Sequence, residues 1–446
     1  MTACAIETAA EDDGAVSRRA FTIAANGAYA ARLAGDGEAL FPERWTLDGP
    51  EPYAVPLPAA QPEDPHAQVL PLVDGRVLIA RRTAGRYVFS LLYPTGPRTG
   101  ELPLGAVESA SLRLLPPPPD GALAYALAPG EHSTGVWLVA GGAHGAPEHV
   151  AEIRGRCSGG AWLDRTGRML ALDRRLEEGG PAKAVAVDLE RGGEVTPLLQ
   201  ITDDSEDRVL LADPDSGLLL IRSDAPSPGH HRLGWGVLGS MMPVRFPECL
   251  RLPDAAVTPF AVQPGQTLTP ETCAVAVRID AAAGSWLGLW RPAGRRLHQL
   301  PAPRGWLAGA GLWTRDGVLR LPYATGAVPC GLAGVDAARV EAARSGGERA
   351  RGAAREAGAV RAGDEREAGA VRAGDEREAG AVRAGDAVRA GDERAAVTEG
   401  PVPDAATPSA QAECAGGEPS GPVTTPGVCK PVPLQQAPLT GRAGPG

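Results

Sequence analysis

A glycine-bearing turn returns along this sequence at a nearly constant interval, and each copy lies between two short apolar runs. Successive turn glycines are 48, 46, 46, 50, 48 and 52 residues apart, in the pairs Asn26-Gly27, Asp74-Gly75, Asp120-Gly121, Thr166-Gly167, Ser216-Gly217, Pro264-Gly265 and Asp316-Gly317. Glycine suits a hairpin turn because it tolerates positive φ. Short strands that repeat at such a period are typical of a β-propeller with one blade per repeat. The sequence therefore predicts an all-β fold, a seven-bladed β-propeller.

Each repeat contains four strand-like runs, with the glycine turn between the first and the second. In the fourth repeat they read CSGGAWLDRTG, RMLALDRRL, AKAVAVDLERG and EVTPLLQI, in which apolar residues alternate with small or polar ones. The third runs carry large side chains that we expect to fill the space between blades, among them Trp45, Trp137, Trp235, Trp286 and Trp290. The second and sixth repeats are the least regular. An antiparallel sandwich would not place its turns in one phase, and a solenoid would need shorter or helical repeats.

Composition and charge limit the classes of partner. A formal net charge of -10 disfavours a sequence-independent nucleic-acid binder, which needs a basic face to displace counterions. We expect no secretory signal, because no basic start precedes an apolar core, and no membrane span, because no apolar run reaches about 18 residues. The cysteines are scattered and never paired as C-x-x-C, so we expect reduced thiols in a cytoplasmic protein. We also expect a monomer. The excess of arginine over lysine is typical of a GC-rich bacterial genome.

Three hairpin motifs suggest a relationship to a known class of propellers. The pieces PDGALAYAL (119–127), DRTGRMLAL (164–172) and DPDSGLLLI (213–221) each place a turn before an apolar second strand. This pattern resembles the WD40-like propellers of the TolB and prolyl-oligopeptidase type, over residues of about 17 to 340. In the oligopeptidase family the propeller gates a hydrolase domain with a Gly-x-Ser-x-Gly motif, which this chain lacks. The resemblance therefore implies a propeller architecture and a gating or recognition ancestry, not peptidase activity.

The composition changes sharply after about residue 336. From residue 354 the chain repeats an 11-residue unit, AREAGAVRAGD. Eleven residues make three helical turns, but two glycines and one valine per unit leave no apolar stripe, so we favour disorder over a transient helix. The predicted organisation is a disordered N-terminus at 1–16, propeller blades at 17–337, a disordered low-complexity insertion at 338–427, a strand at 428–439 and a disordered tail at 440–446.

The run VCKPVPLQQAPL at 428–439 regains a strand-like pattern. The seventh repeat otherwise offers only three strand-like runs. One hypothesis is that 428–439 supplies the fourth strand of the last blade, with the low-complexity tract as a long loop inside that blade. Such a loop is tolerable because the entropy cost of closure grows only logarithmically with length. The alternative is a disordered tail with a chance apolar patch.

Few residues point to a catalytic or metal site. The acidic run at 202–207 joins the fourth and fifth repeats, where carboxylates could hold Ca²⁺, but its spacing differs from an EF-hand and a solvated loop is the alternative. The histidines form neither H-x-H nor H-E-x-x-H, and Ser158 and Ser240 lack a nucleophile elbow. The first runs of the repeats, expected to be the inner strands, are almost wholly apolar, which disfavours a hydrolase or lactonase.

Arginines at the predicted blade edges are the remaining candidates. Arg19, Arg113, Arg156 and Arg208 could line one end of the central channel and attract an anionic ligand, or they could be ordinary surface arginines. We assign no catalytic, cofactor-binding or metal-binding residue and no cofactor from the sequence.

The sequence favours a non-catalytic propeller that acts as a protein-interaction scaffold, since propellers present variable loops on a rigid frame. Its partner would be a protein of unknown identity. The alternatives are a peptide- or small-molecule-recognising module related to oligopeptidase propellers, and a hydrolase with a metal ion at the channel mouth.

Overall fold

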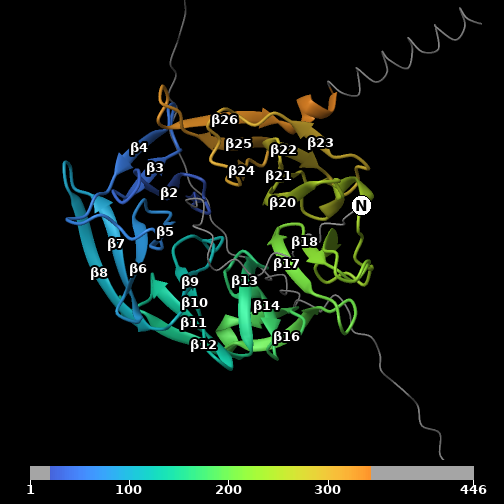
Figure 1. The fold of residues 1–446 in the computed structure, drawn as a ribbon, viewed down its shortest axis with the longest axis horizontal. Helices are drawn as coiled ribbons and strands as arrows, with labels where there is room; N and C mark the ends of the chain where they lie inside the picture. The colour runs from blue at the N-terminus through green and yellow to red at the C-terminus, as the bar shows by residue number, and fades with distance from the viewer. Residues whose placement is uncertain (1–20, 343–446) are drawn as a thin grey trace, which may run out of the picture. The chain divides into compact units, whose positions relative to one another are not determined.

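A computed structural model describes residues 21–342 of the chain. These residues form seven antiparallel sheets that follow one another around a common centre (Figure 1). The predicted all-β, seven-bladed propeller is confirmed. In every blade the first strand is the innermost, and the glycine turn joins it to the second strand.

The strands of the first four blades pair in sequence order, four to a blade. The first blade contains β1 (Thr22–Ile23), β2 (Tyr29–Ala34), β3 (Phe41–Thr46) and β4 (Tyr53–Pro56), and the second contains β5 (Gln68–Pro71), β6 (Val77–Thr83), β7 (Arg86–Pro94) and β8 (Thr99–Glu108). The third contains β9 (Arg113–Leu114), β10 (Ala124–Pro129), β11 (Ser133–Ala140) and β12 (Glu148–Arg154), and the fourth contains β13 (Arg156–Trp162), β14 (Met169–Arg175), β15 (Lys183–Asp188) and β16 (Glu194–Leu199).

The fifth and seventh blades have three strands within the described part of the chain. The fifth contains β17 (Asp207–Ala212), β18 (Leu218–Ser223) and β19 (Arg232–Val237), the sixth β20 (Ala255–Val262), β21 (Val275–Ala281), β22 (Gly284–Trp290) and β23 (His298–Leu300), and the seventh β24 (Leu312–Trp313), β25 (Val318–Tyr323) and β26 (Gly331–Asp336). Three 3-10 turns, Leu189–Arg191, Glu248–Leu250 and Pro270–Thr272, lie in connections. The second and sixth blades, the least regular in sequence, are complete.

The hydrophobic core is divided into clusters that each lie between two consecutive blades. Between the third and fourth blades, for example, Leu127 and Ile153 belong to one cluster with Leu172. The third-strand tryptophans Trp45, Trp235 and Trp290 are at most 5% exposed, which confirms that they fill this space. Burial of apolar surface between sheets is therefore the main force that joins one blade to the next.

The ring is closed by contacts between the last blade and the first. Trp45 and Leu47 of the first blade form a cluster against which Leu307, Ala324 and Leu332 of the seventh blade pack. The propeller is therefore closed by side-chain packing within residues 21–342.

The periodic glycines have a second role besides turning the chain. Gly121 has φ +65°, and a Cβ on it would lie 2.1 Å from Cγ1 of Val73 in the preceding blade. The turns of the fourth, fifth and sixth blades are also bonded to one another, because Asp215 accepts hydrogen bonds from Arg165 and from the Gly265 N–H. Gly27, Gly75 and Gly121 approach a neighbouring blade to within 3.0 Å of an added Cβ, so close approach as well as positive φ selects glycine at these turns.

The chain continues past β26 as a helical segment at 337–342. Ala337 is buried, Val340 packs on the cluster between the sixth and seventh blades, and Glu341 forms an ion pair with Arg291 at 2.7 Å. This segment extends five residues beyond the boundary of the blades predicted at 337. The predicted low-complexity insertion beyond it, the strand at 428–439 and both disordered termini lie outside the described residues.

Candidate functional site

The acidic run at 202–207 encloses a lysine. The Lys183 ammonium donates to Asp207 Oδ2 at 3.0 Å and to Ser205 Oγ at 3.2 Å, and also to the carbonyls of Thr202 and Ser205. Asp207 is fully buried and accepts a further hydrogen bond from Ser223. Of the carboxylates that the sequence offered to Ca²⁺, Asp207 is therefore already paired with a cation that the chain itself supplies, whereas Asp203 accepts from Gln200 and Glu206 pairs with Arg175 and Arg208.

Two of the arginines singled out in the sequence come together at the inner strands. Arg113 of β9 donates to the Gly159 carbonyl of β13, and Arg208 of β17 approaches Ser158 Oγ at 3.4 Å. Both therefore reach the same inner strand of the fourth blade, one from each side. Arg156 is exposed at the start of that strand, and Arg19 lies outside the described residues.

A buried carboxylate lies behind this group of arginines. Asp173 of β14 is 4% exposed, and its Oδ1 accepts a hydrogen bond from the Val209 N–H at 3.0 Å. Burial raises the pKa of Asp173 to about 6, although Arg208, Arg222 and Arg113 favour the charged form. The carboxylate fixes the inner strand of the fifth blade to the fourth and places a negative charge among the guanidiniums.

Asp173 and Arg222 were not candidates in the sequence, although a signal for Asp173 was present there. Asp173 interrupts the apolar run of a second strand, where an unpaired carboxylate would be costly. Arg222 lies opposite Arg208 in the β17–β18 ladder. To predict this pairing from the sequence, one would have to know that a bulge lies between Val209 and Leu211. That bulge shifts the register by one residue and has no sequence marker.

The other nucleophiles and ligands flagged in the sequence lie apart. Ser240 Oγ accepts from the Met242 N–H, and no group of three or more His, Cys, Asp or Glu within 21–342 could hold a metal ion. The four cysteines in this range, Cys157, Cys249, Cys273 and Cys330, are free thiols. Burial raises the pKa of Cys157 and of Cys330 to about 11, so these thiols stay protonated.

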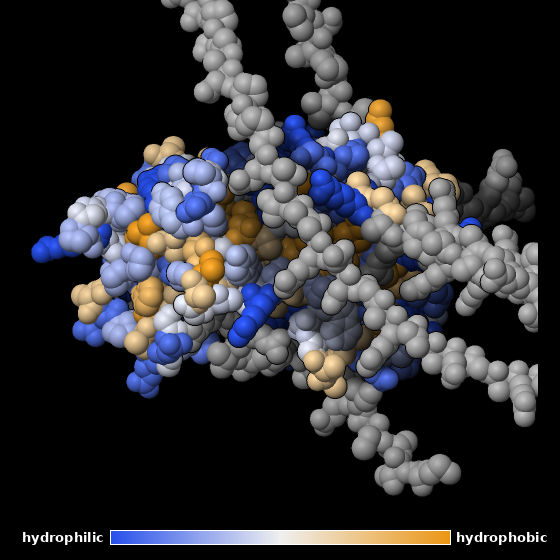
Figure 2. Space-filling model, turned by 90° about the horizontal axis from the view of Figure 1, so that it is seen from above, coloured by the Kyte–Doolittle hydropathy of each residue, from blue (hydrophilic) through white to orange (hydrophobic). Residues whose placement is uncertain are grey.

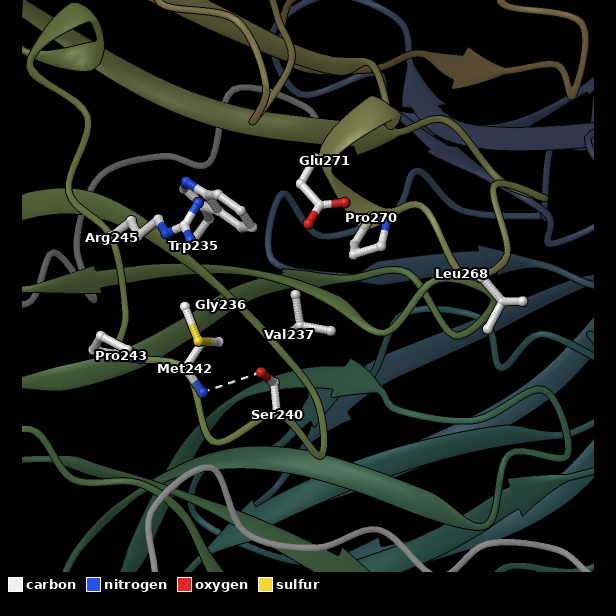
Figure 3. A pocket seen from close by; sticks show the side chains of 10 residues that line it. All are labelled: Trp235, Gly236, Val237, Ser240, Met242, Pro243, Arg245, Leu268, Pro270 and Glu271. Atoms are coloured by element: carbon white, nitrogen blue, oxygen red, sulfur yellow. Dashed lines mark hydrogen bonds between the residues drawn. The ribbon is translucent and has the colours of Figure 1, made fainter.

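A hollow of about 270 Å³ lies between the fifth and sixth blades (Figure 3). Met242 and Arg245, which follow β19, lie on one side, and Leu268, Pro270 and Glu271, from the β20–β21 connection, lie on the other. The Arg245 guanidinium stacks on Trp235, 5.1 Å from the ring centroid. Within the described residues, the Glu271 carboxylate has no hydrogen-bond or ion-pair partner. The hollow therefore combines apolar side chains with two charged groups, the Glu271 carboxylate and the Arg245 guanidinium.

Apolar side chains are unusually exposed around this hollow. Leu268 is 95% exposed and Met242 58%, and Met241 beside it is 72% exposed. Leu268 also has φ +63°, a left-handed backbone conformation that is unfavourable for a leucine. An exposed leucine in this backbone conformation adds strain without burying apolar surface.

Figure 2 views the propeller from the edge at the top of Figure 1, where β4 and β26 lie, and shows apolar residues among polar ones there. The exposed Tyr53 belongs to β4, and Val328 precedes β26.

Among the described residues, no helix is long and apolar enough to cross a membrane.

Comparison with known proteins finds similar folds among solved structures. A protein from Agrobacterium tumefaciens assigned as TolB has a TM-score of 0.35 and 16% identity, covering 49% of this chain and 76% of its own. A puromycin hydrolase has a TM-score of 0.46 and 16% identity, covering 70% and 51%, and prolyl oligopeptidase B from Galerina marginata has 0.46 and 12%, covering 71% and 48%. The chain thus spans about half the length of these two hydrolases.

These structures are the propeller types that the hairpin motifs indicated. At such low identities the likeness concerns the fold alone. No protein-family model and no curated protein matches the chain.

Proposed function

We propose that the chain is a non-catalytic interaction module that binds a protein partner at the hollow between the fifth and sixth blades. The observation that carries this proposal is the exposure of Leu268, Met241 and Met242 around the hollow. Contiguous exposed apolar residues on a folded domain are typical of interaction sites, and methionine adapts to differently shaped partners.

The charge in the hollow specifies the partner further. The Arg245 guanidinium stacks on Trp235, whereas the Glu271 carboxylate faces the hollow without a partner among the described residues (Figure 3). A basic side chain on the ligand would therefore be favoured beside Glu271. The proposed ligand is therefore a short segment of a protein in which an apolar residue, packed on Leu268 and Met242, lies near a lysine or arginine.

A displayed library of random peptides, selected on the full-length chain, tests this proposal. Selected peptides should share an apolar residue close to a basic one, and Leu268→Ser should weaken their Kd, measured by fluorescence anisotropy, at least tenfold. Leu102→Ser is the matched control, because Leu102 is 47% exposed on the outer strand of the second blade and should not affect binding.

Glu271→Gln should weaken binding of the basic peptides and leave neutral ones unchanged. If no peptide is enriched, or if the enriched peptides bind Leu268→Ser as tightly as the unmodified chain, the hollow is not the interaction site. A cytoplasmic location, a monomeric state and the absence of a nucleic-acid partner stay predictions of the sequence.

A further inference from the structure

Three guanidiniums from two blades surround the inner strand of the fourth blade. Arg113 extends from β9 in the third blade, and Arg208 and Arg222 extend from β17 and β18 in the fifth. All three act electrostatically on the buried Asp173 carboxylate of the fourth blade. This group lies away from the hollow between the fifth and sixth blades.

The charges in this group are unevenly compensated. Glu206 Oε2 accepts from Arg208 Nε at 3.1 Å and from Arg208 Nη2 at 3.0 Å. Among the described residues, the Arg222 guanidinium has neither a hydrogen-bond nor an ion-pair partner. Loss of hydration and the neighbouring Arg208 lower the pKa of Arg222, although Asp173 and Glu206 act in the opposite direction.

The position of Arg222 is unfavourable for folding. It lies directly opposite Arg208 in the ladder, and like charges in such a cross-strand pair repel each other. The repulsion would be relieved by a bound anion.

The inner strand of the fourth blade presents backbone without side chains beside these arginines. Gly159 and Gly160 have no Cα partners in β14, because the register shifts between Ser158 and Ala161. A Cβ on Gly159 would lie 2.8 Å from Asp173 Oδ2, and Gly159 has φ +77°. The bulge therefore brings bare backbone, whose carbonyl orients Arg113, next to the guanidiniums.

We propose that Arg113, Arg208 and Arg222 bind a tetrahedral, phosphate-class oxyanion at the inner ends of the third to fifth blades. Guanidiniums arriving from three strands suit an anion with several equivalent oxygens. A carboxylate, by contrast, is satisfied by the planar fork of a single arginine. The ligand would carry this anion as a phosphate or sulfate group, free or esterified.

Inorganic sulfate is the probe, because it stays a dianion across the working pH range. The full-length chain is titrated with sodium sulfate at pH 7.5, with sodium chloride at equal ionic strength as the reference. Calorimetry should show saturable binding to one site, and Arg222→Gln should weaken it at least tenfold. Arg82→Gln is the matched control, since Arg82 is an exposed arginine of β6 in the second blade.

Melting curves separate loss of the site from loss of the fold. Sulfate stabilises proteins generally by exclusion from their surface, so the relevant quantity is the difference between variants. In chloride, Arg222→Gln should melt at or above the temperature of the unmodified chain, since it removes the repulsion with Arg208. Sulfate should raise the melting temperature of Arg222→Gln by less than it raises that of the unmodified chain or of Arg82→Gln.

Three results would overturn the proposal. The first is absence of saturable sulfate binding to the unmodified chain, and the second is equal sulfate binding by Arg222→Gln. The third is sodium acetate binding as tightly as sulfate, which would exclude the tetrahedral class. Phenyl phosphate, tested in parallel, shows whether the anion is accepted as an ester: binding at least as tight as that of sulfate supports an esterified ligand, and weaker binding supports the free anion.

Discussion

Leu312 of the seventh blade packs on the Cα of Gly27 in the first, so closely that a Cβ on Gly27 would lie 2.3 Å from Leu312 Cδ2. The two residues are at opposite ends of the propeller sequence and meet only when the ring is closed. Gly27 also has φ +72°, so both the contact and the backbone require glycine.

Gly27→Ala should therefore lower the free energy of unfolding by about 2–4 kcal/mol, from backbone strain together with overpacking against Leu312. Gly37→Ala is the matched control, because Gly37 has φ +56° but no atom within 4 Å of its added Cβ. It should cost about 1 kcal/mol, the strain alone. Equal losses in urea unfolding would show that the contact between the blades does not matter.

The pKa of Asp173 makes the stability of the protein pH-dependent. The pKa is 3.8 for an ordinary aspartate and about 6 in the folded chain, so the folded state binds a proton first as pH falls. The free energy of unfolding, relative to that of Asp173→Asn, should rise by up to about 3 kcal/mol between pH 7 and pH 4. Below pH 3.8, the pKa of an aspartate in the unfolded chain, the difference between the two free energies of unfolding should stay constant.

Urea unfolding of both proteins at several pH values measures this difference. The charged and titratable groups that act on Asp173 or are affected by it are Arg113, Arg208, Arg222 and the Cys157 thiol. The arginines keep their charge and the thiol stays neutral throughout this range, so the change is assigned to Asp173. A difference independent of pH would contradict the assignment.

Lys183 should contribute strongly to the stability of the loop that leads into the fifth blade. Lys183→Met would leave the fully buried Asp207 carboxylate without its counterion, which typically costs about 3–5 kcal/mol. Arg191→Met is the control, since the half-exposed Arg191 guanidinium pairs with Glu194 at 3.1 Å and with Asp188 at the longer distance of 3.6 Å, and these pairs should together contribute less than about 1 kcal/mol. Adding Asp207→Asn to Lys183→Met should restore part of the stability. If Lys183→Met melts like Arg191→Met, the lysine is not the counterion of the loop.

The last blade provides a test of the strand predicted at 428–439. The apolar residues of β26, Leu332, Ala333 and Val335, are only half-buried, whereas Ala184 to Asp188 of β15, which β16 covers, are buried. Deleting 347–425 should leave the melting temperature unchanged, and deleting 428–446 should lower it. Equal tolerance of the two deletions would contradict the prediction.

The number of blades and the order of strands could be predicted from the sequence because both are periodic. Each turn glycine, such as Gly121 or Gly167, marks the same point of its blade, and the tryptophans of the third strands fall where the blades meet. Local pattern and global fold agree in these elements.

The candidate sites could be predicted only in part. Arg113 and Arg208 were identified as edge arginines, but their meeting with Arg222 depends on two bulges and on the packing of separate blades. The hollow around Leu268 arises from irregular connections, whose shape has no periodic signal. Contacts between connections that are far apart in the sequence can be identified only from the three-dimensional structure.

The division of the core into shared clusters has a consequence for biosynthesis. Trp45 is synthesised early in the propeller, yet Leu332, which helps to cover it, is among the last propeller residues to be synthesised. At roughly 5–20 residues per second, the interval is on the order of tens of seconds. A nascent chain therefore carries an uncovered apolar surface until the ribosome has finished the ring, and that interval is when a chaperone would be needed most.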